Sequence, residues 1–242
     1  MLELTEMKSD GLHFRPEAIQ HILEPNHDKC QECPAMIFRQ DIPFWLETHK
    51  NKKLMVVAQD AGKGKEDHSL NTVFSIHNAH IDLKNYFDTS PRHRRYFELF
   101  KDLIGHDKFL YDIYFTDIIK CAYSTGIEGS FSLASCKEDL FYEINEVDPK
   151  GLILMGKAAQ NAFTAMAVSQ GMNLKLVYRD ACQINTKGQV YFCHYRMDLK
   201  EIFFIPHLIG NLHIATDKKD EFLLFKTRLT TYIQQSLNSK SN

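Results

Sequence analysis

The stretch GLILMGKAA, residues 151–159, places a short apolar run directly before residues of helical composition. The run Leu152–Met155 has the length and the apolar content of a buried strand. Residues 156–169 then have helical composition, and Gly171 follows them as a helix stop. A strand that passes straight into a helix is the repeating unit of an α/β protein.

The same alternation continues on both sides of this unit. It predicts six strands: Leu54–Ala58, Tyr111–Thr116, Leu152–Met155, Leu174–Tyr178, Val190–Cys193 and Ile202–Ile205. It also predicts helices over 91–105, 136–147 and 156–169, and a last helix from Asp217 with an apolar stripe of Phe222, Phe225, Leu229 and Ile233. This order is typical of a parallel sheet covered by helices on both faces.

The chain has 242 residues, is 44% hydrophobic and 25% charged, and shows no change of composition that would mark a linker. We therefore expect a single domain over 1–237 and a disordered tail over 238–242. No apolar run reaches transmembrane length, and the acidic start, residues 1–6, is unlike a signal peptide. The prediction is a cytoplasmic monomer that does not bind a membrane.

The net charge of −2 means that any nucleic-acid-binding surface must be a local patch. The clearest basic run is Arg92-His93-Arg94-Arg95, within the helix predicted over 91–105. Such a run is more often an ordinary solvated helix face.

Four cysteines form two pairs, Cys30 with Cys33 near the N-terminus and Cys121 with Cys136 in the middle of the chain. Two thiolates one helical turn apart can bind one side of a metal centre, and a second pair from a distant segment can complete it. A 4Fe-4S cluster and a zinc ion both accept four thiolates, so both stay open. The alternative is four buried free thiols. The remaining cysteines are interpreted as core residues: Cys182 and Cys193.

Polar residues follow three of the predicted strands. Gln59 and Asp60 follow the first, Asp117 follows the second, and His207 follows the last. In open α/β sheets, ligands bind beyond the carboxyl ends of the strands, so the three segments indicate one site. Asp60 is also compatible with a helix N-cap, and His207 with a surface histidine.

In their order along the chain, these motifs resemble those of the uracil-DNA glycosylase superfamily, and most closely its iron–sulfur-containing branch, family four. The corresponding segments are Cys30 with Cys33, the loop 58–62, the run 116–121 (Thr-Asp-Ile-Ile-Lys-Cys), Cys136, and the loop 206–210. The match extends from residue 30 to about residue 212. Its most specific parts are the cysteine spacing and the Lys120-Cys121 pair.

The resemblance implies a three-layer α/β/α sandwich with a short, mostly parallel central sheet. It also implies a structural 4Fe-4S cluster and a partner, DNA, from which a damaged or deaminated base is hydrolysed after it is flipped into a pocket. In such an enzyme Asp60 would orient water and stabilise the positively charged sugar. His207 would donate a hydrogen bond to the departing base. The cluster ligands would be Cys30, Cys33, Cys121 and Cys136.

The resemblance also supplies candidates for substrate binding: Gln59, Phe74, Asp117, Leu208, Ile209 and Asn211. Leu208 and Ile209, with Leu212, stand where an apolar wedge would fill the gap left by the flipped nucleotide, although they could instead anchor the loop. Phe74 lies near the position of a ring that stacks on the base, and it fits a strand core equally well.

Asp117 departs from the asparagine of the family motif. An amide both donates to and accepts from a base edge, whereas an ionised carboxylate only accepts. Either Asp117 is protonated, or the preferred base presents adjacent N–H donors, or the chain is inactive. The sequence therefore predicts a DNA glycosylase of base excision repair with an open base preference. The alternative is a catalytically silent member of the same fold that binds nucleic acid or a nucleotide.

Overall fold

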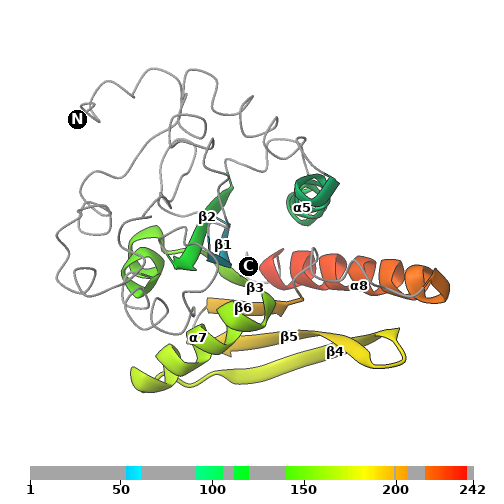
Figure 1. The fold of residues 1–242 in the computed structure, drawn as a ribbon. Coiled ribbons are helices and arrows are strands. Elements are labelled where there is room, and N and C mark those ends of the chain that lie inside the picture. The colour runs from blue at the N-terminus through cyan, green and yellow to red at the C-terminus, as the bar shows by residue number, and fades with distance from the viewer. Residues whose placement is uncertain are drawn as a thin grey trace, which may run out of the picture.

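The computed structural model describes residues 53–60, 91–105, 112–119, 140–198, 200–206 and 216–238, which form a mixed sheet with helices (Figure 1). The six strands are β1 (Leu54–Asp60), β2 (Ile113–Ile119), β3 (Gly151–Met155), β4 (Lys175–Asn185), β5 (Gly188–Met197) and β6 (Lys200–Ile205). Their order across the sheet is β2-β1-β3-β6-β5-β4. Every strand predicted from the sequence is present, and the α/β class is confirmed.

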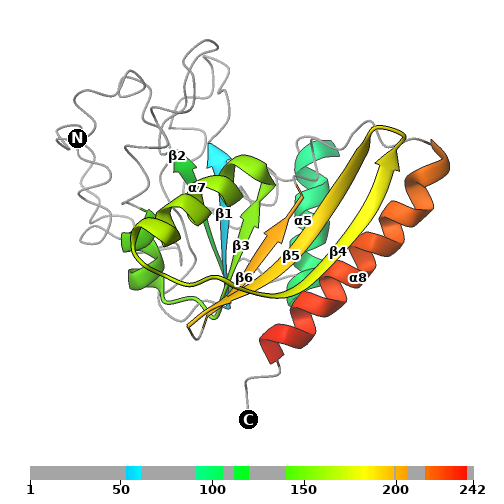
Figure 2. The ribbon, with the colours of Figure 1, turned by 90° about the horizontal axis from the view of Figure 1, so that it is seen from below.

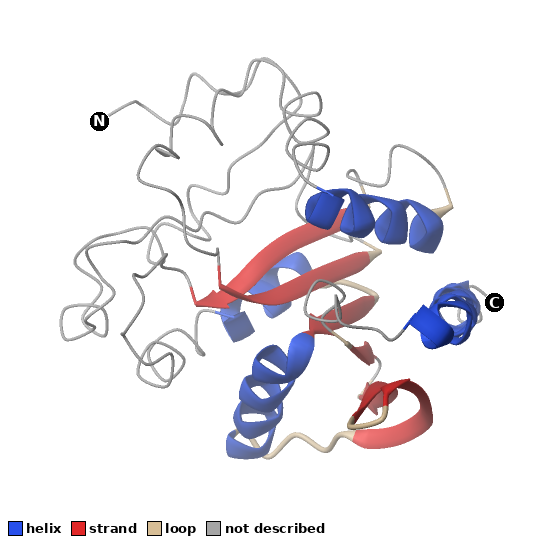
Figure 3. Cartoon of the chain, turned by 45° about the vertical axis from the view of Figure 1, so that its right-hand side comes forward, coloured by secondary structure: helices blue, strands red, loops and turns tan. Residues whose placement is uncertain are grey.

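The helices form a layer on each face of the sheet, as Figure 3 shows. The first layer contains α5 (Pro91–Ile104) and α8 (Lys219–Asn238), which follows the short helix η5 (Thr216–Lys218). The second contains a helix over 140–147 and α7 (Gly156–Ser169). Pro91 is the first residue of α5, where its missing N–H has no cost. The fold is a three-layer α/β/α sandwich.

Two apolar clusters fill the spaces between the layers. Along β1, Leu54 and Val56 belong to the cluster beneath α5 and α8, whereas Met55 and Val57 belong to the cluster beneath α7. β3 is buried along its whole length. Continuous apolar strands of this kind are required where helices cover both faces of a sheet.

The predicted apolar stripe of the last helix is confirmed. Phe225, Leu229 and Ile233 are buried in the first cluster, and Phe222 packs partly buried against it. Asn238, which the sequence analysis assigned to the tail, is instead the last residue of α8. Residues 239–242 lie outside the described part of the chain.

Glycines at both ends of α7 allow the strand and the helix to follow each other closely. Gly156 has a φ of 82°, a conformation that lets the chain turn directly from Met155 into the helix. Gly171, the predicted stop, has a φ of 68°, and the N–H of Met172 donates to Ala167 O at 2.8 Å.

The sheet is mostly parallel, as expected, and one part of it is antiparallel. β1, β2, β3 and β6 run parallel, but β5 is antiparallel to both of its neighbours, β4 and β6. Only Thr186 and Lys187 separate β4 from β5, and only Asp198 and Leu199 separate β5 from β6. Such short connections can join antiparallel strands only, because a parallel pair needs a long crossover.

Two of the parallel strands also extend past their predicted carboxyl ends. β1 includes Gln59 and Asp60, and β2 includes Asp117 through Ile119, so these polar residues lie within strands rather than after them. The extension has a simple cause, since Ala58 pairs with Asp117 and Asp60 pairs with Ile119. Backbone pairing between β1 and β2 continues past the apolar runs from which the ends of these strands were predicted.

In the described residues, no helix is both long enough and apolar enough to cross a membrane.

Candidate functional site at the carboxyl edge of the parallel strands

The four parallel strands end at one edge of the sheet, which Figure 2 shows as the end where the arrowheads of β1 and β2 lie. Asp117 pairs with Ala58 between β2 and β1, and Met155 pairs with Ile205 between β3 and β6. Val57, the residue before Ala58, pairs with Leu154, the residue before Met155. The two pairs therefore lie at the same level along the strands. The segments that carry the predicted site residues therefore reach one edge together.

The arrangement at this edge is that of a topological switch point. α5 is the first described helix after β1, and it packs on one face of the sheet. α7 follows β3 and packs on the opposite face. β1 and β3 are neighbours in the sheet. Helices that leave adjacent strands toward opposite faces open a crevice between the carboxyl ends of those strands, the usual place for a ligand in this fold class.

Gln160, which is not among the predicted site residues, links two strands at this edge. Its Nε2 donates to Ile205 O at 2.8 Å and to Leu154 O at 3.4 Å. The amide thus ties the ends of β6 and β3 to the first turn of α7. Its position one turn after a strand end is the only signal in the sequence that could have indicated this role.

Among the predicted site residues, the structure places the backbones of Gln59, Asp60 and Asp117. Asp60 is the last residue of β1, two positions beyond Ala58, the partner of Asp117. The other predicted residues lie outside the described part of the chain: Cys30, Cys33, Phe74, Cys121, Cys136, His207, Leu208, Ile209 and Asn211. Pro206, immediately before His207, is described and buried at the end of β6.

A buried carboxylate, also absent from the sequence predictions, supports β2 beside Asp117. Glu143 is 0% exposed and lies in the helix over 140–147. Its carboxylate accepts hydrogen bonds from Tyr114 Oη at 2.8 Å and from Thr116 Oγ1 at 3.1 Å. Both hydroxyls project from β2, so the carboxylate fixes the strand up to the residue before Asp117. Buried charge of this kind is retained only where hydrogen bonds compensate its desolvation.

A second buried polar cluster joins α8 to the antiparallel part of the sheet. His194 Nε2 lies 2.6 Å from Glu201 Oε2, and His194 Nδ1 lies 2.9 Å from Tyr232 Oη. Arg196 Nε donates to Glu201 Oε1 at 3.3 Å. His194 and Glu201 are 1% and 2% exposed. We call these four residues the His194 cluster.

The His194 cluster has the connectivity of a catalytic relay but not its location. Glu201 is the second residue of β6, so the cluster lies toward the edge opposite the carboxyl ends of the parallel strands. Tyr232 stacks on Tyr178 with ring centroids 4.3 Å apart, and His194 stacks on Phe203 at 4.7 Å. The Tyr232 hydroxyl can donate to Nδ1 or accept from it, so the contacts suit either protonation state of His194. The cluster is a structural connection between α8 and the sheet.

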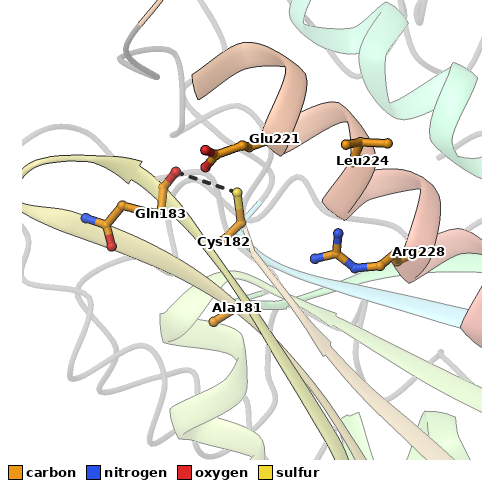
Figure 4. Close-up of a pocket in the computed structure, with 6 residues that line it drawn as sticks. All are labelled: Ala181, Cys182, Gln183, Glu221, Leu224 and Arg228. Atoms are coloured by element: carbon orange, nitrogen blue, oxygen red, sulfur yellow. Dashed lines mark hydrogen bonds between the residues drawn. The ribbon is translucent and has the colours of Figure 1, made fainter. Parts of the chain in front are cut away.

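A small surface pocket lies between β4 and α8, with Cys182 at its base (Figure 4). It has a volume of about 180 Å³ and is lined by Ala181, Cys182, Gln183, Glu221, Leu224 and Arg228. Burial raises the pKa of the Cys182 thiol, and the nearby Glu221 carboxylate raises it further. Cys182 is a residue of the apolar core, as predicted.

Cys193 has a comparable environment. It packs partly buried against the second apolar cluster, and desolvation raises the pKa of its thiol. The interpretation of both cysteines as packing residues is confirmed. Among the described residues, no group of three or more histidine, cysteine, aspartate or glutamate side chains could hold a metal ion. The four cysteines predicted as ligands lie outside those residues.

Comparison with protein-family models and with curated proteins gave no match to this chain.

Proposed function

We propose that this protein is a DNA N-glycosylase that hydrolyses the bond between a damaged or deaminated base and its deoxyribose. One observation supports the proposal above the others: Asp60, Asp117 and the segment that leads into His207 reach the same edge of a parallel sheet, at its switch point. Two of the segments that resemble those of uracil-DNA glycosylases, 58–60 and 116–119, pair there, and Pro206, the first residue of a third such segment, follows β6. DNA is the proposed partner, and a cytoplasmic monomer is the proposed form.

The spacing of the strands suits a base held between two catalytic groups. β3 separates β1 from β6, so the strand that carries Asp60 and the strand before His207 are about 10 Å apart, at ~4.8 Å per strand. A flipped base would lie between them, above the end of β3. Asp60 would orient water and stabilise the positive charge that develops on the sugar, and His207 would stabilise the negative charge on the departing base.

The four-thiolate donor set suits a 4Fe-4S cluster, with zinc as the alternative. In this proposal Cys30, Cys33, Cys121 and Cys136 hold the group, which has a structural role. Replacing Cys30 with alanine is expected to release the metal and much of the folded stability, because metal binding is linked to folding. Iron and zinc analysis of anaerobically purified protein, combined with absorption near ~400 nm, measures the first effect.

Cys182→Ala is the matched control for this experiment. It removes a thiol from the apolar core and should leave the metal content unchanged. Stoichiometric zinc without iron would show that the four cysteines bind zinc and not an iron–sulfur cluster. Metal-free protein that folds normally would exclude a metal centre of either kind.

Asp117 determines the proposed base preference. Its neighbour Thr116 is fixed by Glu143, so the backbone has little freedom to move the carboxylate away from a base that binds at the strand ends. An ionised carboxylate favours a base edge with two adjacent N–H donors, and it disfavours uracil by ~1–3 kcal/mol, the cost of one unpaired buried group. Asp117→Asn should therefore shift excision toward uracil.

The measurement is the ratio of single-turnover rates on uracil and on a purine lesion, for the parent and for Asp117→Asn. Asp112→Asn, the same substitution just before the opposite end of β2, is the control and should keep the parental ratio. Strong uracil excision by the parent that Asp117→Asn leaves unchanged or reduces would refute this account of specificity.

Asp117 is also the observation that favours a second candidate, a silent member of the fold that binds nucleic acid or a nucleotide without cleaving it. A panel of oligonucleotides, each with a single lesion, separates the two functions. Release of a free base from any member of the panel by purified protein of known metal content supports the glycosylase. Binding without release across the whole panel supports the silent protein.

A further inference from the structure

The β4–β5 hairpin extends past the end of its neighbour in the sheet. β5 pairs with β6 only from Cys193 to Met197, and Cys193 lies opposite Phe204. Ile205, the last residue of β6, is thus level with Phe192. The part of the hairpin from Gly188 to Tyr191, with its turn, continues roughly 13 Å further at ~3.3 Å per residue.

The extension occurs at the edge that carries the candidate site. β4 is parallel to β6 because both are antiparallel to β5, so β4 ends at the same edge as β1, β2 and β3. Figure 2 shows the β4–β5 turn at the end of the sheet where β1 and β2 also end. The hairpin is therefore a two-stranded ribbon that projects beside the proposed base-binding crevice.

One face of this ribbon is covered by α8 and the other is not. Cys182, Val190 and Phe192 are buried in the apolar cluster beneath α8. The alternate residues, Arg179, Ala181, Gln189 and Tyr191, are exposed, and Gln183 is partly so. We call these five residues the outer ribbon face.

The outer ribbon face contains no carboxylate. Asp180 lies between two of its residues in sequence but belongs to the opposite face, where its Oδ2 accepts a hydrogen bond from Arg228 Nε of α8 at 2.9 Å. Arg179 is exposed on the outer face, and Lys187 is exposed in the turn. The charge of this surface is therefore positive, although the whole chain carries −2.

Three of the five side chains of the outer ribbon face contact one another. The Arg179 guanidinium lies over the Tyr191 ring, 4.5 Å from its centroid, and Tyr191 Oη donates to Gln189 Oε1 at 2.7 Å. In the turn, the N–H of Lys187 donates to Asn185 Oδ1 at 2.9 Å. Ordering these side chains in advance reduces the entropy that binding would cost.

We propose that the outer ribbon face and the turn bind the duplex DNA that flanks the target nucleotide. The inference rests on the proposed glycosylase function. A two-stranded ribbon fits the major groove, arginine and lysine neutralise phosphates, and glutamine and tyrosine offer neutral hydrogen-bonding groups. The absence of carboxylates from the described residues of this face and its place beside the crevice favour a polyanion over a second copy of a net acidic chain.

The test compares two double variants with equal loss of charge. Arg179→Gln with Lys187→Gln alters the ribbon, and Lys150→Gln with Lys175→Gln removes two exposed cations from the opposite edge, at the starts of β3 and β4. Fluorescence anisotropy with a labelled, lesion-free duplex of ~20 base pairs gives the affinity at several salt concentrations. The ribbon variant should lose about 2 units of the slope of log K against log salt, at ~0.9 per phosphate contact, whereas the control should keep the parental slope.

Equal slopes for the ribbon variant and the parent would overturn the ribbon assignment and leave the glycosylase proposal intact. So would self-association of the parent that the ribbon variant abolishes, because the face would then bind a second copy. Excision from a single-stranded oligonucleotide of a few nucleotides, too short to reach the ribbon, tests the glycosylase proposal separately. A parent that binds no duplex at any salt concentration and excises no lesion would overturn both.

Discussion

Replacing Glu201 with alanine is expected to lower the free energy of unfolding by about 3–5 kcal/mol, the cost typical of removing one partner from a buried, hydrogen-bonded pair of ionisable groups. The Glu201 carboxylate is 2% exposed and accepts hydrogen bonds from His194 and Arg196. Its loss would remove the acceptor for both groups while the His194 ring stays in a desolvated position. Urea denaturation followed by circular dichroism measures the change.

Two control variants separate the effect of the buried carboxylate from that of removing any carboxylate. Glu221 is an exposed residue of α8 whose carboxylate forms an ion pair with Lys218 of η5. Glu221→Ala should lower the free energy of unfolding by less than about 1 kcal/mol. Glu201→Gln keeps an oxygen acceptor without the charge, so its cost should lie between those of the two alanine variants. A cost below about 1 kcal/mol for Glu201→Ala would show that the His194 cluster is not a significant connection between α8 and the sheet.

The positions of the strands were predictable because burial on both faces leaves continuous apolar runs. β3 and β6 have such runs, and both were assigned to within two residues. The ends of β1 and β2 were not predictable in the same way. Asp60 and Asp117 are poor strand formers, yet they continue the strands because each pairs with a residue of the neighbouring strand.

The antiparallel part of the sheet had a local signal that the strand predictions did not use. The segment Asn185-Thr186-Lys187-Gly188 has turn residues at both ends, and only two residues separate the strands that it joins. The predicted strands Leu174–Tyr178 and Val190–Cys193 are much shorter than β4 and β5. The eleven residues between the predicted strands could therefore have been a crossover connection between parallel strands. The exposed residues of β4 have no apolar periodicity, so its length depends on pairing with β5.

The predicted site residues and the buried polar residues differ in how sequence can reveal them. Asp60 and His207 follow apolar runs, so the rule for strand ends indicated both. Glu143 and Tyr114 are 29 positions apart, and each is unremarkable in its own helix or strand. Only the packing of 140–147 against β2 makes their hydrogen bond. The His194 cluster likewise combines residues from β5, β6 and α8.

Replacing Asp60 with alanine is expected to reduce the single-turnover rate of base excision by ~100-fold or more, the usual cost of removing an aligned charged group from a transition state. Asp60 ends β1, where it pairs with Ile119 of β2, so its backbone is held at this edge of the sheet. A carboxylate positioned there by the backbone would need little reorganisation when positive charge develops on the sugar. His207→Ala should cause a loss of the same order.

Asp112→Ala is the matched control for Asp60→Ala. Asp112 precedes β2 at the opposite edge of the sheet, where its Oδ2 lies 3.2 Å from Lys53 Nζ in a partly exposed ion pair. Its removal changes the net charge by the same amount and should leave the excision rate unaltered. Since Asp60 is proposed to act on the transition state, Asp60→Ala should bind a lesion-containing duplex as tightly as the parent does. If Asp60→Ala and His207→Ala both excise the base at the parental rate, the catalytic site lies elsewhere, and the carboxyl edge of the sheet loses its proposed role.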